Sequence, residues 1–204
     1  SPGDTIIVAG FGNGSDALLF TVTEEIEKVK GQKRGLTRYL ESKRDLTSYE
    51  KYLAFRGFIS PEGGIRAEAI PYTALSLTWR DRREILGLCG TRCKRCGTPQ
   101  YPAQRVCVNP ECGAIDEMEY YRFSDKKGTI FSFTGDLLAF TPNPPGIYAV
   151  IDFDGGGRFW FDVTDCDPES IEIGMPVEGS FRRRYVDEKG GIIGYFWKVV
   201  PILG

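Results

Sequence analysis

The carboxyl-terminal third of the chain alternates apolar and polar residues in short runs separated by turn residues. The sequences DGGG and DEKGG lie between such runs and predict two β-hairpins. The proline-rich stretch TPNPPG predicts a loop, because proline cannot occupy a central strand. Five strands in about 75 residues predict a small closed or partly closed barrel such as an OB-fold. The expected strands are 128–135, 147–154, 158–164, 176–186 and 191–200.

The first sixty residues have a different pattern. The sequence TIIVAGFG (residues 5–12) is almost continuously apolar, which is typical of a strand covered on both faces. A glycine-rich turn, GNGSD, leads to a second strand, ALLFTVT (17–23), and two short amphipathic helices follow at 36–43 and 45–57. Two strands and two short helices cannot bury such a strand. We therefore expect this segment to be the last piece of a larger fold.

The middle of the chain is divided by composition. Glycine and proline punctuate residues 60–78, which we interpret as a linker. The sequence TWRDRREILGL then predicts a short helix or turn that packs on the cysteine-rich segment after it.

Four of the six cysteines lie within twenty residues. Cys93 and Cys96 form a C-x2-C pair, Cys107 and Cys112 form a C-x4-C pair, and glycine follows each pair directly. A following glycine permits positive φ, so that backbone amides can point back at sulfur. Two such knuckles predict one tetrahedral four-thiolate zinc site, with two disulfides and rubredoxin-type iron as weaker alternatives. Because four protein ligands leave no open coordination position, the ion should be structural.

The other two cysteines are assigned no role. Cys89 lies four residues before Cys93 and offers an alternative ligand, but an idle or buried thiol is the better interpretation of both Cys89 and Cys166.

Composition excludes several function classes. The chain of 204 residues has a formal charge of −2, which gives no electrostatic reason to expect nucleic acid or an anionic membrane as partner. It contains no histidine, so serine–histidine and cysteine–histidine dyads and HExxH sites are excluded. There is no apolar run long enough to span a bilayer and no signal peptide opens the chain, so we expect a cytoplasmic protein.

Two other functions fit parts of the sequence. An OB-fold invites a nucleic-acid hypothesis, in which aromatic side chains stack on bases and arginines touch phosphates. The residues concerned are Phe131, Phe133, Phe159, Trp160, Phe161, Arg182, Arg183 and Arg184. The simpler interpretation is that one aromatic face forms the core and the arginines lie on a solvated strand. A self-contained enzyme using Asp162 or Asp165 is the third class, but no spacing singles out such a pair.

The cysteine knuckles followed by GTIFSFTG, a proline-rich loop, IYAVIDFD-GGGRFWFDVTD and IEIGMPVEGSFRRRY resemble the acyl-CoA-associated zinc-ribbon/OB-fold family. This family was long catalogued only as a domain of unknown function, and the resemblance covers about residues 79–200. It implies a non-catalytic accessory or scaffold subunit that accompanies enzymes acting on acyl-CoA.

The sequence GDTIIVAGFGNGSDALLFTVTEEI, followed by LTRYLESKRDLTSYEKYLAFRGFI, resembles the carboxyl end of hydroxymethylglutaryl-CoA synthases, which have a thiolase-like fold. The resemblance covers residues 3–59 and is most specific over GSDA and SYEKYLAFRG. It implies that the backbone of Gly12, Asn13 and Gly14 helps to position an acyl thioester. The family's catalytic cysteine, histidine and glutamate all lie upstream of the matching stretch.

Together these observations predict an α+β, mainly β, chain of four parts. Residues 1–59 would end a thiolase-like condensing fold, 60–78 would be the linker, 79–122 the lead-in and rubredoxin-like zinc ribbon, and 123–204 a five-stranded OB-fold barrel. The expected function is a non-catalytic part of an acyl-CoA condensing enzyme that performs Claisen-type chemistry on CoA thioesters. Its expected partners are a thiolase-fold subunit with the catalytic cysteine and a second acyl-CoA enzyme, in a hetero-oligomer.

Overall fold

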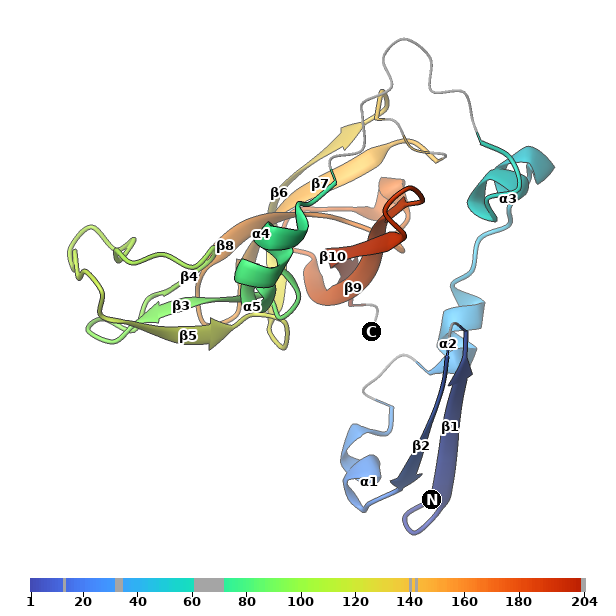
Figure 1. The fold of residues 1–204 in the computed structure, drawn as a ribbon, viewed down its shortest axis with the longest axis horizontal. Helices are drawn as coiled ribbons and strands as arrows, with labels where there is room; N and C mark the ends of the chain where they lie inside the picture. Colours follow the sequence, from blue (N-terminus) through green and yellow to red (C-terminus); the bar gives the residue numbers. More distant parts are fainter. Residues whose placement is uncertain (13, 32–34, 61–71, 140, 142, 203–204) are drawn as a thin grey trace. The chain divides into compact units, whose positions relative to one another are not determined.

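The fold was taken from a computed structural model, which describes residues 1–12, 14–31, 35–60, 72–139, 141 and 143–202 (Figure 1). The chain divides into two compact units, Ser1–Thr47 and Ser48–Gly204. The helix predicted at residues 45–57 therefore falls almost entirely in the same unit as the ribbon and barrel. The four domain boundaries expected from sequence stay predictions.

The first unit is built on one antiparallel hairpin. Strands β1 (Thr5–Phe11) and β2 (Ser15–Thr21) pair in register from Thr5↔Thr21 to Phe11↔Ser15. Both predicted strands are therefore confirmed, and the glycine-rich sequence forms their turn. Helices α1 (Glu25–Val29) and α2 (Leu36–Glu41) follow. Every residue of both strands is exposed, so the structure shows the hairpin without the covering that its apolar sequence predicts.

The second unit contains the predicted five-stranded barrel. Its strands are β6 (Lys127–Asp136), β7 (Gly146–Phe153), β8 (Arg158–Asp162), β9 (Pro176–Asp187) and β10 (Ile192–Pro201). They form one sheet in the order β10-β9-β6-β7-β8. A parallel bridge between Val163 and Val199 then connects the end of β8 to β10, which closes the barrel. This strand order and closure are those of an OB-fold. A 3-10 turn, η1 (Pro168–Ser170), lies between β8 and β9.

Alternation along the strands fills the barrel. On β7, Ile147, Ala149, Ile151 and Phe153 are buried while the residues between them are half-buried. On β8, Phe161 is buried at 2% exposure. The buried residues recur at every second position, which is the pattern that the sequence predicted for the barrel core.

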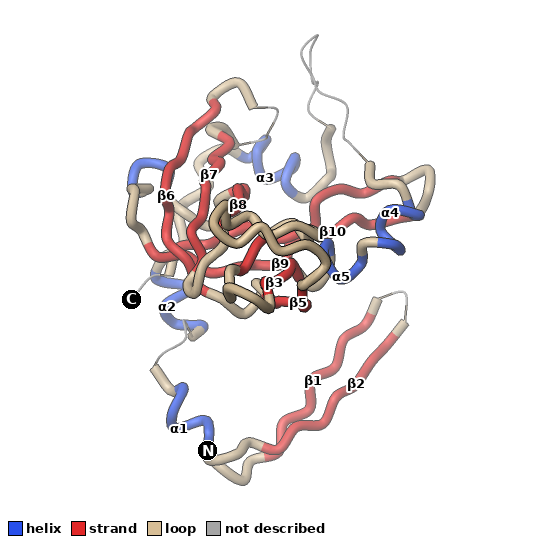
Figure 2. Tube along the Cα trace, turned by 90° about the vertical axis from the view of Figure 1, so that its left-hand side faces the viewer, coloured by secondary structure: helices blue, strands red, loops and turns tan. Residues whose placement is uncertain are grey.

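The zinc ribbon is a three-stranded antiparallel sheet beside the barrel. Its strands are β3 (Cys89–Cys93), β4 (Pro99–Gln100) and β5 (Met118–Arg122), in the order β4-β3-β5. Leu88, Tyr101 and Phe123 from this region are buried in the same hydrophobic cluster as the barrel strands. Ribbon and barrel therefore share one core, and Figure 2 shows the barrel strands β6 and β7 running side by side.

In the described part of the second unit, three short helices precede the ribbon. Helix α3 (Tyr49–Phe55) is capped at its amino end by Ser48, whose side chain accepts a hydrogen bond from Lys51 N, and it ends before Gly57, which has φ of 73°. Helices α4 (Leu75–Arg80) and α5 (Arg82–Ile85) form the predicted lead-in. Trp197 Nε1 donates to Leu86 O at 3.0 Å, which attaches the lead-in to β10.

The segment expected to be a linker is partly helical. Helix α4 begins at Leu75, inside the range expected to be a linker, because the run LSLTWR continues the lead-in helix toward the amino terminus. Residues 61–71 of that linker lie outside the described part of the chain. Among the described residues, no helix is both long and apolar enough to cross a membrane.

Candidate metal centre

The structure brings the four predicted ligands together. The Sγ atoms of Cys93, Cys96, Cys107 and Cys112 all lie within 4.8 Å of one another. Cys93 Sγ is 3.8 Å from Cys112 Sγ, and Cys96 Sγ is 3.5 Å from Cys107 Sγ. Tetrahedral zinc with Zn–S bonds of about 2.3 Å requires sulfur atoms about 3.8 Å apart. The donor set and spacing therefore fit zinc, and each of the six cysteines is free of a disulfide.

The first knuckle is formed by a tight turn after β3. Gly97 N donates to Cys93 O at 2.9 Å, and Cys93 N donates to Thr98 O at 3.0 Å. Gly97 has φ of 77°, a conformation that favours glycine, so the glycine after the first cysteine pair has the predicted positive φ. This turn places Cys96 Sγ 3.1 Å from the Thr98 hydroxyl.

The second knuckle accommodates its longer spacing through Asn109. Cys112 N and Gly113 N both donate to Asn109 O, at 3.0 and 3.2 Å, and Asn109 Oδ1 accepts from Glu111 N at 3.0 Å. Gly113 has φ of 55°. The C-x4-C spacing thus still forms a compact turn, because one asparagine satisfies several backbone amides of the insertion.

Gln100 holds the second knuckle against the ribbon, and sequence reasoning missed it. Its side chain is buried; Nε2 donates to Val106 O at 2.9 Å, while Oε1 accepts from Val108 N at 3.0 Å. These two bonds fix the backbone on either side of Cys107. The only sequence signal is a polar residue between the two cysteine pairs, which is too common to single out.

Replacing Gln100 by alanine should therefore loosen the metal centre. The change removes two buried hydrogen bonds and leaves backbone groups unsatisfied, a cost of roughly 2–4 kcal/mol. We expect faster zinc transfer to a chelator and a lower urea midpoint. Gln104→Ala is the matched control, because Gln104 is exposed. Equal zinc transfer from both variants would contradict the role of Gln100.

The protein environment shifts the pKa values of Cys96 and Cys107 in opposite directions. Hydrogen bonds from Thr98 lower the pKa of Cys96 to about 6, whereas burial raises the pKa of Cys107 to about 12. A bound dication would hold both as thiolates, since metal ligation deprotonates a coordinating thiol. Because all four positions would be filled by sulfur, the ion would stabilise the fold and leave no site for a substrate.

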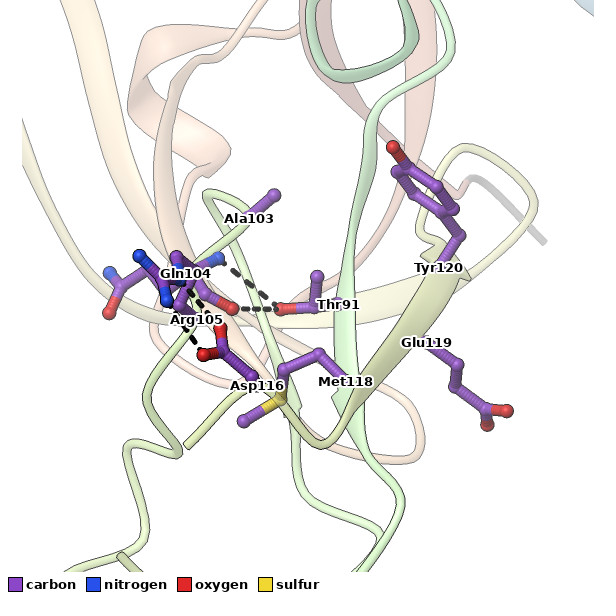
Figure 3. Close-up of a pocket in the computed structure, with 8 residues that line it drawn as sticks. All are labelled: Thr91, Ala103, Gln104, Arg105, Asp116, Met118, Glu119 and Tyr120. Carbon is purple, nitrogen blue, oxygen red and sulfur yellow. Dashed lines mark hydrogen bonds and ion pairs between the residues drawn. The ribbon is translucent and has the colours of Figure 1, made fainter. Parts of the chain in front are cut away.

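A groove of about 360 Å³ lies on the ribbon between the 103–105 segment and the strands β3 and β5 (Figure 3). Its polar groups bind one another. Arg105 Nε and Nη2 donate to the two oxygens of Asp116, each at 2.6 Å, and Thr91 Oγ1 donates to Gln104 O at 3.3 Å. Glu119 pairs with Arg92. Every one of these groups has an internal partner, so the groove contains no constellation of poised acid, base and nucleophile.

Several of the residues considered for other functions lie in the core or in ion pairs. Phe161 lies in the barrel core and Phe159 packs against it, whereas Trp160 points outward, as the one-face interpretation predicted. Arg182 forms an ion pair with Asp165, and Lys198 Nζ lies 3.1 Å from Asp162. Gly12 and Gly14 lie at the β1–β2 turn, with Gly12 N donating to Gly14 O at 2.8 Å, and Asn13 lies outside the described residues.

The family models that match this chain agree with this architecture. The family described as "ChsH2, rubredoxin-like zinc ribbon domain" matches residues 83–116, and "ChsH2, C-terminal OB-fold domain" matches residues 121–182. A solved structure titled "Ltp2-ChsH2(DUF35) aldolase" has 20% identity and a TM-score of 0.46, covering 66% of this chain and 98% of that chain.

Curated relatives match over a longer stretch of the chain than either family model. The DUF35 domain-containing scaffold protein of Methanocaldococcus jannaschii is 36% identical over 128 residues, covering 61% of this chain and 89% of the relative. Those of Methanothermobacter thermautotrophicus and Pyrococcus furiosus are 34% and 30% identical, covering 61% and 63% of this chain and 93% of each relative. The predicted zinc ribbon and OB-fold are thereby confirmed, and the chain belongs to the DUF35 domain-containing scaffold proteins.

Proposed function

We propose that this chain is the non-catalytic scaffold of an assembly that performs Claisen-type carbon–carbon chemistry on CoA thioesters. Two lines support the proposal. The ribbon and barrel belong to a family of scaffold proteins. The amino-terminal segment resembles the carboxyl end of hydroxymethylglutaryl-CoA synthases, over GSDA and SYEKYLAFRG in particular.

The observation that carries the proposal is that the β1–β2 hairpin is apolar on both faces. The pairs Ile6↔Phe20 and Val8↔Leu18 lie on one face, and Ile7↔Leu19 and Ala9↔Ala17 lie on the other. Exposure of the large apolar side chains ranges from 48% for Ile6 to 94% for Phe11. A hairpin with one solvated face would alternate polar residues with apolar ones, and this hairpin does not.

Such a hairpin needs specific surroundings. A two-stranded hairpin is marginally stable at best, so the partner has to contribute strands beside β1 or β2. Because both faces are apolar, the partner also has to supply a packed layer on each face. A thiolase-type condensing subunit meets both requirements, since its sheets lie between layers of helices. The hairpin would complete one of those sheets.

This arrangement divides the chemistry between polypeptide segments. The partner contributes the nucleophilic cysteine that forms the acyl-enzyme, and this chain, which has no histidine, contributes structure. The turn at Gly12, Asn13 and Gly14 would lie where its backbone helps to position the acyl thioester. Cys93, Cys96, Cys107 and Cys112 would hold one structural zinc ion that keeps the ribbon folded.

A crosslinking map of the purified assembly tests the proposal. We expect short crosslinks from Lys28 and Lys30, just after the hairpin, to lie on the subunit with the catalytic cysteine. Hydrogen exchange should be slow along β1 in the assembly and fast in the separate chain, because an added strand protects backbone amides. Rapid exchange at Thr5–Phe11 in the complete assembly would exclude the condensing-enzyme interpretation of this segment.

A further inference from the structure

The four cysteines of the metal centre differ in how well the protein covers them. Cys93 is 1% exposed and Cys107 is 6% exposed. Cys112 is half-buried, whereas Cys96 is exposed. Cys96 lies in the turn after β3, and residues 94–97 of that turn are all exposed. A reactive molecule in solution therefore reaches this cysteine before the other three.

A second sulfur atom lies close to the exposed one. Cys107 Sγ is 3.5 Å from Cys96 Sγ, which is shorter than the 3.8 Å between Cys93 Sγ and Cys112 Sγ. Small side-chain movements bring sulfur atoms at this separation into covalent contact. The Thr98 hydroxyl lies 3.1 Å from Cys96 Sγ, where it can donate to the thiolate and hold it at the surface of the knuckle. The two knuckles thus present one accessible sulfur with a covered sulfur directly behind it.

We propose that Cys96 is a site of oxidation by hydrogen peroxide, and that Cys107 completes the reaction by forming a disulfide with it. The inference does not depend on the scaffold role. It assigns to the metal centre a sensitivity to oxidants in addition to its structural role.

The chemistry takes two steps. The Cys96 thiolate attacks one oxygen of the peroxide, the O–O bond breaks, and hydroxide leaves, so that Cys96 becomes a sulfenic acid. The Cys107 thiolate then attacks the Cys96 sulfur, the S–O bond breaks, and a second hydroxide leaves as the disulfide forms. The two thiolates together lose two electrons, and one molecule of peroxide takes up both.

The disulfide would dismantle the metal centre. It removes two of the four thiolates, and Cys93 and Cys112 alone cannot complete a tetrahedral site. The first knuckle leads directly into β4, whose Pro99 lies against Gly156 in the turn between β7 and β8 of the barrel. Because ribbon and barrel also share a core, loss of the knuckle should lower the melting temperature of the barrel as well.

Peroxide treatment of the unaltered, zinc-loaded chain tests the proposal. A chromogenic chelator measures released zinc, and differential alkylation with peptide mass spectrometry locates the oxidised cysteines. We expect about one zinc ion released for each Cys96–Cys107 disulfide formed. Dithiothreitol with added zinc should restore the metal content and the melting temperature, because a disulfide is reversible.

A second measurement tests the order of reaction without any oxidant. Under limiting N-ethylmaleimide, Cys96 of the zinc-loaded chain should be alkylated at least about tenfold faster than Cys93 or Cys107, because accessibility controls the reactivity of thiolates. Alkylation of Cys93 or Cys107 at the same rate as Cys96 would overturn the assignment of Cys96 as the exposed target.

The control is the double variant Cys89→Ser/Cys166→Ser, which removes the two cysteines outside the cluster. It should release zinc under peroxide at the same rate as the unaltered chain. Much slower release would make one of those thiols the target and overturn the proposal. Retention of zinc under peroxide, or a disulfide that joins Cys96 to a cysteine other than Cys107, would overturn it equally. None of these outcomes bears on whether the chain binds a condensing subunit, so the scaffold role is tested separately.

Discussion

Aspartate at either face of the amino-terminal hairpin should abolish binding of the condensing subunit. We expect this of Val8→Asp/Leu18→Asp and, independently, of Ile7→Asp/Leu19→Asp. Each pair lies directly opposite across the two strands, and the two pairs lie on opposite faces. An uncompensated buried charge costs about 3–5 kcal/mol, so either variant should weaken association by at least about 100-fold.

The informative result is that aspartate on either face of the hairpin weakens binding of the condensing subunit. A hairpin lying on the surface of its partner would tolerate charge on its outer face, whereas a hairpin inside a sandwiched sheet tolerates charge on neither. Isothermal titration against the condensing subunit measures the difference. Thr5→Asp/Thr21→Asp is the control, because it adds the same two charges on a directly opposite pair at the open end of the hairpin. If one face accepts aspartate without loss of affinity, the three-layer arrangement is wrong.

These substitutions should leave the zinc module unaffected. The hairpin belongs to the compact unit Ser1–Thr47, and the cysteines belong to Ser48–Gly204. Zinc content should therefore stay constant in all hairpin variants. This separates a loss of docking from a general loss of folding.

The barrel was predictable because its signal is local. Inward residues such as Ile147 and Ile151 recur every second position, and each predicted hairpin is closed by glycine-containing turns. The metal centre was predictable for a similar reason, since two short cysteine spacings with a following glycine have few structural uses. In both cases the information lies within a few residues of where it acts.

The shared core and the role of Gln100 could not be predicted from the sequence, because both depend on contacts between distant segments. Phe123, Tyr101 and Leu88 join ribbon and barrel into one core, and their side chains have no periodic pattern that reveals it. The Gln100 side chain bonds backbone atoms of Val106 and Val108. Any buried side-chain amide could make these bonds, so the sequence does not single out Gln100. For β1–β2, the covering that its apolar sequence predicts is not found among the described residues, where both of its faces are exposed.

Replacing one zinc ligand should unfold the ribbon and weaken the barrel beyond it. We expect Cys107→Ser to lose its zinc ion, because three thiolates and a hydroxyl bind zinc far more weakly than four thiolates, and because site formation and local folding are coupled. Elemental analysis of the purified chain measures the zinc, which should fall from one ion per chain to a small fraction. Circular dichroism should show loss of β-structure.

The effect should extend to the barrel because the two share a core. Once the ribbon unfolds, the buried rings of Tyr101 and Phe123 lose their places against Phe153 and Phe159. Losing one large core aromatic costs about 3–5 kcal/mol, so the barrel should melt at a markedly lower temperature than in the unaltered chain. A ribbon that was only tethered to the barrel would leave this melting transition unchanged.

Two cysteines outside the cluster supply the controls. Cys89→Ser and Cys166→Ser should each retain one zinc ion, because neither sulfur belongs to the four-cysteine cluster. Cys89 is the stricter control, since it starts the strand that ends at Cys93 and is the nearest alternative ligand in sequence. Loss of zinc from Cys89→Ser together with its retention by Cys107→Ser would reassign the ligand set. Full retention by all three variants would mean that the four thiols hold no ion in common.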